Sequence, residues 1–300
     1  MALSKILIAN RGEIAVRIIR AARELGVRTV QVYSTADANS LAVEMADESI
    51  EIGPPPAKKS YLNVEAVLNA AKETGCDSIH PGYGFLAENA EFADAVAVAG
   101  MAFVGPSGDV IRRMGDKASA RQAAKQAGVP TVPGSDGLID DLAKAEKLAD
   151  EIGYPIMIKA TAGGGGRGIR IAANAAEFMS LAPQAAAEAE AAFGDGGLYL
   201  EKVIERARHI EVQILGDGEN FIHCYERECS LQRRRQKVWE EAPSSALTPA
   251  VREKLCASAV ALAAAVKYKG AGTIEYLYDD QTGDYYFIEM NTRIQVEHPV

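Results

Sequence analysis

The sequence predicts an α/β fold that begins with a parallel, doubly wound sheet. Short apolar runs and segments of helical periodicity alternate along residues 5–105, a pattern typical of parallel strands joined by covering helices. From about residue 204 the pattern changes to longer strands with one intervening helix. A chain of 300 residues, 48% hydrophobic and 24% charged, has the size and composition of a globular protein with two domains.

The first expected strand covers residues 5–9, and a helix follows it directly. Ile14, Ile18 and Leu25 recur at helical spacing, and Gly26 ends this helix. The other strands expected in this part of the chain lie at residues 29–33, 49–52, 78–79 and 102–104. The other helices are expected near residues 64–74, 88–99 and 107–129, with a short one before residue 49.

A domain boundary is expected near residue 130. Pro130, Pro133 and Gly134 interrupt the helical pattern there, since proline and glycine commonly end regular elements. A smaller α/β unit is expected at residues 131–203. The later elements are expected to be strands at residues 209–215, 221–225, 272–278 and 285–290 and a helix at residues 248–268.

The composition argues against a protein that binds nucleic acid or spans a membrane. The chain has 41 acidic and 32 basic residues, a formal net charge of −9, whereas a nucleic-acid-binding surface is positively charged. We recognise neither a run of about 18 apolar residues nor a signal peptide, so no membrane partner is expected. The four cysteines form no C-x-x-C pair, which favours reduced thiols and a cytoplasmic location.

The last residues predict that the chain is a C-terminally truncated piece of a longer protein. The sequence stops at Val300, within a dense run of polar residues that have the character of a functional site. Natural termini are usually less ordered and less rich in such residues.

The glycine-rich segment 163–168 is a candidate phosphate-binding loop. It lies between strand-like runs at residues 155–160 and 168–172, and it lacks the Lys-Ser or Lys-Thr that ends a Walker loop. Glycines let the backbone approach a phosphate closely, and a hairpin of this kind can fold over a nucleotide. Lys159 and Arg167 lie beside the glycines and favour a phosphate-binding flap over the alternative, a plain flexible hairpin.

Two glutamates in neighbouring strands form a candidate metal site. A three-residue hairpin loop at residues 281–283, with its glycine in the left-handed conformation, would pair Asp280 with Asp284. In that register Glu275 lies directly opposite Glu289, with Cβ atoms about 4.5–5.5 Å apart. Two carboxylates at this separation repel each other unless a cation lies between them, and such sites suit Mg²⁺ or Mn²⁺. The alternative is an exposed pair of like charges without a metal.

Polar side chains occupy every second position from residue 289 to residue 297. In an extended chain they point to one face, and they are Glu289, Asn291, Arg293, Gln295 and Glu297. Met290, Ile294 and Val296 would then face the core. An acid and an amide can hold a metal ion, an arginine can bind an anion, and the final carboxylate can act as a general base. A solvated strand face is the alternative.

The segment Gln232–Lys237 contains four cations in six residues. Such a cluster can indicate nucleic-acid binding. Because the chain is acidic and Glu240 and Glu241 follow closely, a basic strip that faces an anionic substrate is the better interpretation. A solvated run of charges is the remaining alternative.

Several segments together resemble the biotin carboxylase family. They read IANRGEIA, HPGYGFL, MGDK, GGGGRG, QRRRQK, EAP and FIEMNTRIQVEHPV and lie at residues 8–15, 80–86, 114–117, 163–168, 232–237, 241–243 and 287–300. They extend over essentially the whole chain in the order of the family, and their combination is highly specific. The family includes the biotin carboxylase subunit of acetyl-CoA carboxylase and the matching domains of acyl-CoA and pyruvate carboxylases.

The resemblance implies a fold, an activity and partners. The fold would be a Rossmann-like N-terminal domain at residues 1–112 and an ATP-grasp domain at residues 113–300, with a lid at residues 131–203 and an incomplete C-terminal end. The activity would be that of a ligase in which ATP and bicarbonate form carboxyphosphate, which then carboxylates biotin. The implied partners are a biotin carboxyl carrier protein, which holds the biotin, and a carboxyltransferase, and the full-length protein would be a homodimer.

The resemblance also implies roles for particular residues. The ATP site would be lined by Lys117, Lys159, Gly164, Gly165, Gly166, Glu201, Lys202, Ile204, His209, Gln232 and Arg235. The metal ligands would be Glu275, Glu289 and Asn291. The bicarbonate site would contain Lys237, Arg293, Gln295 and Val296. Of the catalytic residues Lys237, Arg293 and Glu297, the glutamate would deprotonate bicarbonate and the arginine would stabilise the charged intermediate.

Two features depart from the family pattern. Position 235 is arginine where family members commonly have histidine, so nucleotide contacts there are expected to differ. The family also continues well beyond residue 300, so this chain alone is expected to bind weakly or to be inactive. The competing functions are a nucleotide-binding fragment without turnover and another bicarbonate-using ATP-grasp ligase.

Overall fold

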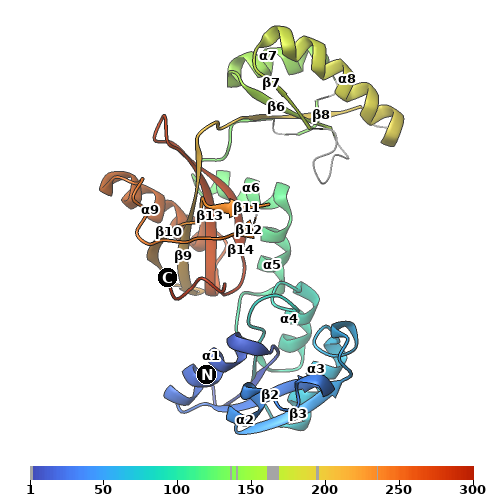
Figure 1. Cartoon of the computed structure of the whole chain (residues 1–300), viewed down its shortest axis with the longest axis vertical. Helices are drawn as coiled ribbons and strands as arrows, with labels where there is room; N and C mark the ends of the chain where they lie inside the picture. The colour runs from blue at the N-terminus through green and yellow to red at the C-terminus, as the bar shows by residue number, and fades with distance from the viewer. Residues whose placement is uncertain (1–2, 136, 140, 161–168, 194–195, 235) are drawn as a thin grey trace. The chain divides into compact units, whose positions relative to one another are not determined.

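The structure is a computed structural model that describes residues 3–135, 137–139, 141–160, 169–193, 196–234 and 236–300 (Figure 1). The chain forms two compact units. The first contains residues 1–129, 208–278 and 287–300, and the second contains residues 130–207 and 279–286. Among the described helices, none combines the length and the apolar composition that a membrane crossing requires.

A parallel sheet of five strands forms the N-terminal part of the first unit (Figure 1). Its order is β3-β2-β1-β4-β5, and every neighbouring pair is parallel. The strands are β1 (Lys5–Ile8), β2 (Arg28–Ser34), β3 (Glu48–Gly53), β4 (Ser78–His80) and β5 (Ala102–Phe103). The helices are α1 (Gly12–Glu24), α2 (Leu41–Met45), α3 (Val64–Glu73) and α4 (Ala90–Val98), with 3-10 turns at Thr35–Asp37 and Ala57–Lys59. Because the chain winds first to one side of β1 and then to the other, the predicted doubly wound sheet is confirmed.

The parallel sheet is buried on both faces. Leu7 of β1 packs with Val30 and Ile79 in one apolar cluster, whereas the next residue, Ile8, packs with Ile14 of α1 in another. Successive residues of a strand point to opposite faces, so a sheet that is covered on both sides needs apolar residues at nearly every position. This requirement explains the continuous apolar runs in the sequence.

The helical segment expected at residues 107–129 consists of two helices, α5 (Gly108–Gly115) and α6 (Lys117–Gln126). Asp116 separates them with an extended backbone, and its carboxylate accepts the Ser119 N–H at 2.8 Å. This hydrogen bond satisfies one of the free N–H groups at the start of α6, as an N-terminal cap does.

An antiparallel sheet in the order β10-β9-β13-β14 completes the first unit. Its strands are β9 (Ala207–Asp217), β10 (Phe221–Glu228), β13 (Lys269–Asp279) and β14 (Tyr285–Asn291). Helix α9 (Pro249–Ala265) packs on one face, where Ser258 Oγ and Tyr276 OH are 3.0 Å apart. Because β13 alternates, Glu275 points to the opposite face. A short ribbon that was not predicted, β11 (Gln232–Arg233) and β12 (Gln236–Lys237), lies between β10 and α9 in the sequence.

The turn between β13 and β14 is one residue longer than the hairpin loop that was considered from the sequence. The Asp279 N–H donates to the Asp284 carbonyl oxygen at 2.8 Å, and the Gly283 N–H donates to that of Asp279 at 2.8 Å. Asp279 rather than Asp280 therefore faces Asp284, because the Asp280 N–H donates instead to the Arg206 carbonyl oxygen at 3.0 Å. Gly283 has φ +78°, the left-handed conformation that was expected.

The second unit is a small α/β body, as the sequence predicted. Its antiparallel sheet has the order β7-β6-β8 and shares one apolar cluster with two helices. These elements are α7 (Leu142–Ile152), β6 (Ile156–Ala160), β7 (Ile169–Ala172), α8 (Ala175–Phe193) and β8 (Leu198–Lys202). Residues 161–168, which include the candidate phosphate-binding glycines, join β6 to β7 in the sequence and lie outside the described residues.

Candidate active site

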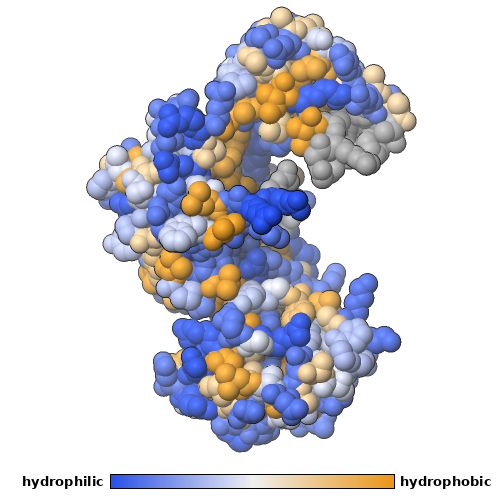
Figure 2. Space-filling view, viewed as in Figure 1, coloured by the Kyte–Doolittle hydropathy of each residue, from blue (hydrophilic) through white to orange (hydrophobic). Residues whose placement is uncertain are grey.

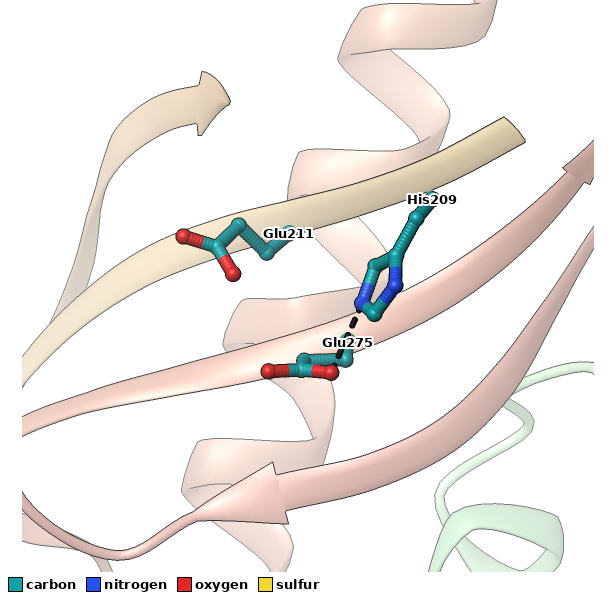
Figure 3. Close-up of side chains that lie close together, drawn as sticks. All are labelled: His209, Glu211 and Glu275. Carbon is teal, nitrogen blue, oxygen red and sulfur yellow. Dashed lines mark hydrogen bonds and ion pairs between the residues drawn. The ribbon is translucent and has the colours of Figure 1, made fainter. Parts of the chain in front are cut away.

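Three side chains from neighbouring strands meet on the face of the antiparallel sheet opposite α9 (Figure 3). His209 and Glu211 are two residues apart in β9, so both point to the same side as Glu275 of β13. The His209 Nε2 and Glu275 Oε2 atoms are 2.7 Å apart. One nitrogen or oxygen atom from each of the three residues lies within 4.8 Å of the others. The spacing is close enough for the three side chains to act on one ligand.

Lys237 of β12 connects three buried carboxylates. Its Nζ donates to Glu211, to Glu275 Oε1 at 3.2 Å and to Glu297 Oε1 at 2.7 Å. The exposed fractions are 0% for Glu211, 5% for Glu275 and 8% for Glu297. Charges in such surroundings interact strongly because little water screens them. One ammonium group shared by three carboxylates leaves this cluster rich in negative charge.

The same contacts shift the pKa values of two members of the cluster. Burial alone would lower the pKa of Lys237, but the charges of Glu275 and Glu211 outweigh it and raise this pKa above its usual range. Burial would likewise raise the pKa of Glu275, but His209 and Lys237 lower it to about 2. At neutral pH the lysine is therefore a cation and the glutamate an anion.

Glu275, Glu289 and Asn291 offer oxygen atoms to a divalent cation. Asn291 donates through Nδ2 to Glu275 Oε1 at 2.7 Å, and Glu289 is two residues earlier in β14, so it points to the same face. Burial and then the charge of Glu275 raise the pKa of Glu289, as expected for two carboxylates that lie close together. Their grouping on one face rests on the contact between Asn291 and Glu275, because the longer turn shifts the register from which the direct pairing of Glu275 with Glu289 was predicted. This donor set fits Mg²⁺ or Mn²⁺.

The extended conformation expected through residue 297 is wrong beyond β14. The strand ends at Asn291, and residues 296–299 form a turn in which the Val300 N–H donates to the Glu297 carbonyl oxygen at 2.9 Å. Because the chain turns, Val296 does not face the core and is 58% exposed. Met290 is buried, as predicted.

The polar residues of this terminal segment nevertheless converge on the cluster. Glu297 reaches Lys237, and Gln295 Nε2 lies 3.5 Å from Glu275 Oε1. Arg293 donates from Nε to Glu88 Oε2 at 3.0 Å and from Nη2 to the side-chain oxygen of Asn291 at 3.3 Å. The turn thus brings together, by another path, the side chains that strand alternation was expected to align.

Gln232 connects the ribbon to His209. Its Nε2 lies 2.7 Å from His209 Nδ1 and 3.0 Å from the Cys229 carbonyl oxygen. Gln232 pairs directly with Lys237 across the ribbon, so both side chains lie on the same face. Arg235, which lies between β11 and β12 in the sequence, is outside the described residues.

The remaining predicted ATP-binding residues lie in both units. Lys117 is the first residue of α6 in the first unit, and its positive charge lowers the pKa of Glu289, against the larger effect of burial. In the second unit Lys159 forms an ion pair with Glu201, and Lys202 donates to the Gly153 and Tyr154 carbonyl oxygens at 3.0 and 2.9 Å. Ile204 is half-buried there, and Gly164, Gly165 and Gly166 lie outside the described residues.

Sequence reasoning assigned no role to three residues that the structure places in or beside this cluster: Glu88, Glu211 and Arg227. Glu211 is two residues after His209 in a predicted strand, and this alternation was sufficient to find it. Glu88 and Arg227 carry no comparable signal, because only the tertiary fold brings them near Arg293 and Glu211.

Two family profiles match the chain. The profile described as "Biotin carboxylase, N-terminal domain" matches residues 2–111. The profile described as "Carbamoyl-phosphate synthase L chain, ATP binding domain" matches residues 116–300. The two matches follow each other along the chain and leave only a short gap between them.

Curated relatives match the chain over nearly its full length. It is 58% identical to Biotin carboxylase 1 of Bacillus subtilis over 99% of this chain and 66% of that protein. It is 56% identical to the biotin carboxylase of Nostoc over 100% of this chain and 67% of that protein. It spans a smaller share, 56%, of the chloroplastic Biotin carboxylase 2 of Populus trichocarpa, to which it is 58% identical over 99% of this chain.

The solved structures that resemble the whole chain include two with bound ADP. The biotin carboxylase domain of a thermophilic 2-oxoglutarate carboxylase bound to ADP has a TM-score of 0.93 and 52% identity, covering 100% of this chain and 66% of that one. The dimeric biotin carboxylase domain of the Hydrogenobacter thermophilus 2-oxoglutarate carboxylase, in complex with MgADP, ADP and bicarbonate, has a TM-score of 0.79, 52% identity and the same coverage. Agreement of sequence and fold over this length establishes that the chain belongs to the biotin carboxylase family.

Proposed function

We propose that the protein carboxylates biotin held on a carrier protein, using ATP and bicarbonate. The observation that carries this proposal is the position of Lys237, whose ammonium group lies among Glu211, Glu275 and Glu297. A cation beside a buried carboxylate offers a binding group and a base to the same small anion. The solved relative that contains MgADP and bicarbonate supports this choice of substrates.

Glu297 would act as the general base of the first step. It would accept the proton of bicarbonate, whose oxygen then attacks the γ-phosphorus of ATP as the bond to ADP breaks. The products are carboxyphosphate and ADP. Lys237 and Arg293 would bind the anion and offset its growing charge, and Gln295 and Val296 would complete the bicarbonate site.

The carboxyl group would then pass to biotin. Carboxyphosphate would give its carboxyl group to the ureido nitrogen of biotin as the bond to phosphate breaks, and the released phosphate would take up the proton that the nitrogen loses. Arg293 would stabilise the negative charge during this step, and its present partner, Glu88, holds the guanidinium group in place. Carboxyphosphate reacts with water, so the reaction needs a closed site.

Glu275, Glu289 and Asn291 would hold Mg²⁺ or Mn²⁺, which would neutralise charge on the ATP phosphates. The proposed ATP-binding residues are Lys117, Lys159, Gly164, Gly165, Gly166, Glu201, Lys202, Ile204, His209, Gln232 and Arg235. Residues 131–203 would close over the nucleotide as a lid, within an ATP-grasp domain at residues 113–300 that follows an N-terminal domain at residues 1–112.

The chain would work together with other proteins. A biotin carboxyl carrier protein would deliver biotin to the site, and a carboxyltransferase would use the carboxylated product. We propose a homodimer for the full-length protein, and the dimeric solved relative supports it. The four unpaired cysteines favour a reducing compartment, which we propose to be the cytoplasm.

An assay of carboxybiotin tests the proposed function. The full-length protein and this chain are each incubated with biotin, MgATP and bicarbonate, both carboxybiotin and ADP are measured, and turnover is expected of the full-length protein. We expect carboxybiotin to depend on bicarbonate and to fall to background in Glu297→Ala. ATP binding without carboxybiotin would instead identify a nucleotide-binding fragment, and bicarbonate-dependent ATP cleavage that biotin does not alter would identify another ligase.

A further inference from the structure

Arg227 is a buried cation beside the site, and none of the steps above uses it. It lies directly opposite Glu211 in the pairing of β10 with β9 and is 2% exposed. Nε donates to Glu211 Oε1 at 2.6 Å, Nη1 to Gln213 Oε1 at 3.0 Å and Nη2 to Thr273 Oγ1 at 3.4 Å. These partners fix the plane of the guanidinium group, and none of them belongs to the proposed substrate-binding set.

Glu211 connects Arg227 to the site. Its Oε1 accepts from Arg227, whereas its Oε2 accepts from Lys237 Nζ. Lys237 also donates to Glu297 at 2.7 Å and to Glu275 at 3.2 Å. The carboxylate of Glu211 thus links Arg227 to Lys237 through hydrogen bonds, and through it Arg227 can act on the position of Lys237.

The charges show what this link does. Glu211 is fully buried, so its carboxylate must be balanced by nearby cations. Arg227 supplies that balance from the side away from Glu297. Without Arg227, Lys237 would be the only remaining cation on Glu211 among the described contacts. Glu211 would then draw the ammonium group toward itself and away from Glu297.

We propose that Arg227 is a positioning residue for the bicarbonate site. By balancing the charge of Glu211, it leaves the Lys237 ammonium group placed beside Glu297, where it can bind an incoming bicarbonate. This inference rests on the proposed function, since it assigns Arg227 to the substrate that Lys237 binds.

Three variants test this role through the kinetics of bicarbonate-dependent ATP cleavage. Arg227→Met is expected to raise the KM for bicarbonate by about tenfold or more and the KM for ATP by less than about twofold. Glu211→Gln combined with Arg227→Met removes both charges, so the KM for bicarbonate should return to within about threefold of the wild-type value. Arg227→Lys keeps the charge and loses the planar group, and an intermediate KM is expected.

The double variant and Arg227→Lys keep the test decisive if Arg227→Met alone does not fold, because neither leaves Glu211 without a balancing charge. In that case Arg227→Lys must still raise the KM for bicarbonate more than the KM for ATP. The proposal is overturned if both KM values rise together, if the variants leave the KM for bicarbonate unchanged, or if the double variant shows no recovery. Wild-type protein without bicarbonate-dependent ATP cleavage would contradict the proposed function instead.

Discussion

The two sheets of the first unit bury different kinds of polar residues. Within the described part of the parallel sheet and its helices, the buried polar side chains are uncharged, and they are Asn10, Thr29, Gln31, Ser34, Ser60 and Ser78. In and beside the antiparallel sheet the buried side chains include the charged residues Glu211, Glu226, Arg227, Glu228, Glu275 and Glu297. Buried charges need partners and add little stability of their own. The parallel sheet thus has the composition of a scaffold, and the antiparallel sheet that of a site.

The antiparallel sheet itself contains two kinds of buried charge. Glu226 has its own cation, Arg252, at 2.7 Å, which is a closed structural pair. Glu211, Glu275 and Glu297 instead share Lys237, and only Glu211 of these three pairs with a further cation, Arg227, among the described contacts, so the cluster keeps an excess of carboxylate. Excess negative charge attracts metal ions and cationic side chains, and these cations can in turn bind an anionic substrate. Figure 2 shows hydrophilic and hydrophobic residues interspersed over the visible face.

The largest effect is expected at the proposed base, Glu297. Glu297→Gln keeps the size of the side chain and removes its ability to accept a proton, so bicarbonate-dependent ATP cleavage should fall about 10³-fold. The rate at saturating bicarbonate and ATP is the measurement, and the free energy of unfolding is its control. A variant that retains a tenth of the rate would remove Glu297 from the chemistry.

A substitution in the parallel sheet should instead lower the stability of the protein and leave its KM values unchanged. Ile79 is 0% exposed in β4, so Ile79→Ala should lower the free energy of unfolding by about 3 kcal/mol through lost contacts and a cavity. Urea unfolding measures this loss, while the KM values for ATP and bicarbonate should stay at the wild-type level. Changed KM values without loss of stability would contradict the division between scaffold and site.

A pair of matched substitutions separates the two kinds of buried carboxylate. Glu275→Gln should raise the Mg²⁺ concentration that gives half-maximal ATP cleavage by about tenfold, because a proposed ligand loses its charge. Glu226→Gln, at the closed pair with Arg252, is the control and should leave the Mg²⁺ requirement unchanged. If both variants show the same requirement, Glu275 is not a metal ligand.

The smallest effect is expected at Asp37, in the 3-10 turn that follows β2. Burial would raise its pKa, but hydrogen bonds from Tyr61 and Ser34 and the charge of Arg11 outweigh it and hold the pKa below the usual 3.8. A depressed carboxyl pKa adds stability above the unfolded pKa, and this stability is lost as pH falls from there through the folded pKa.

Asp37→Asn should therefore lower the free energy of unfolding by about 1 kcal/mol at pH 7, with a difference that shrinks below about pH 4. Chemical unfolding of both proteins from pH 3 to pH 8 measures it. A difference independent of pH over this range would show that the charge of Asp37 is unimportant.

Much of this architecture could be predicted from the sequence, because strand and helix periods are local properties. Helix α1 ends where Gly26 was expected to end it, and Gly26 has φ +69°. The predicted direct pairing of Glu275 with Glu289 assumed a turn that is one residue too short, and a shift of one residue exchanges the two faces of a strand. The contact between Asn291 and Glu275, rather than the predicted register, groups the candidate metal ligands. The path after Asn291 could not be predicted, because alternating polarity fits both a strand and a turn whose side chains are drawn to Lys237. The proposed role of Arg227 could not be predicted either, because it depends on the pairing of β10 with β9.

Ligand-induced stabilisation of the wild-type protein and Lys237→Met tests the central claim most directly. Unfolding is followed with MgADP alone and with MgADP plus bicarbonate at ten times its Kd, where one bound ligand adds about 1.4 kcal/mol. We predict that both proteins are stabilised by MgADP and that only the wild type gains the further increment from bicarbonate. An equal bicarbonate increment in Lys237→Met would contradict the assignment of this half-buried lysine, and of the charged face around it, to the anionic substrate.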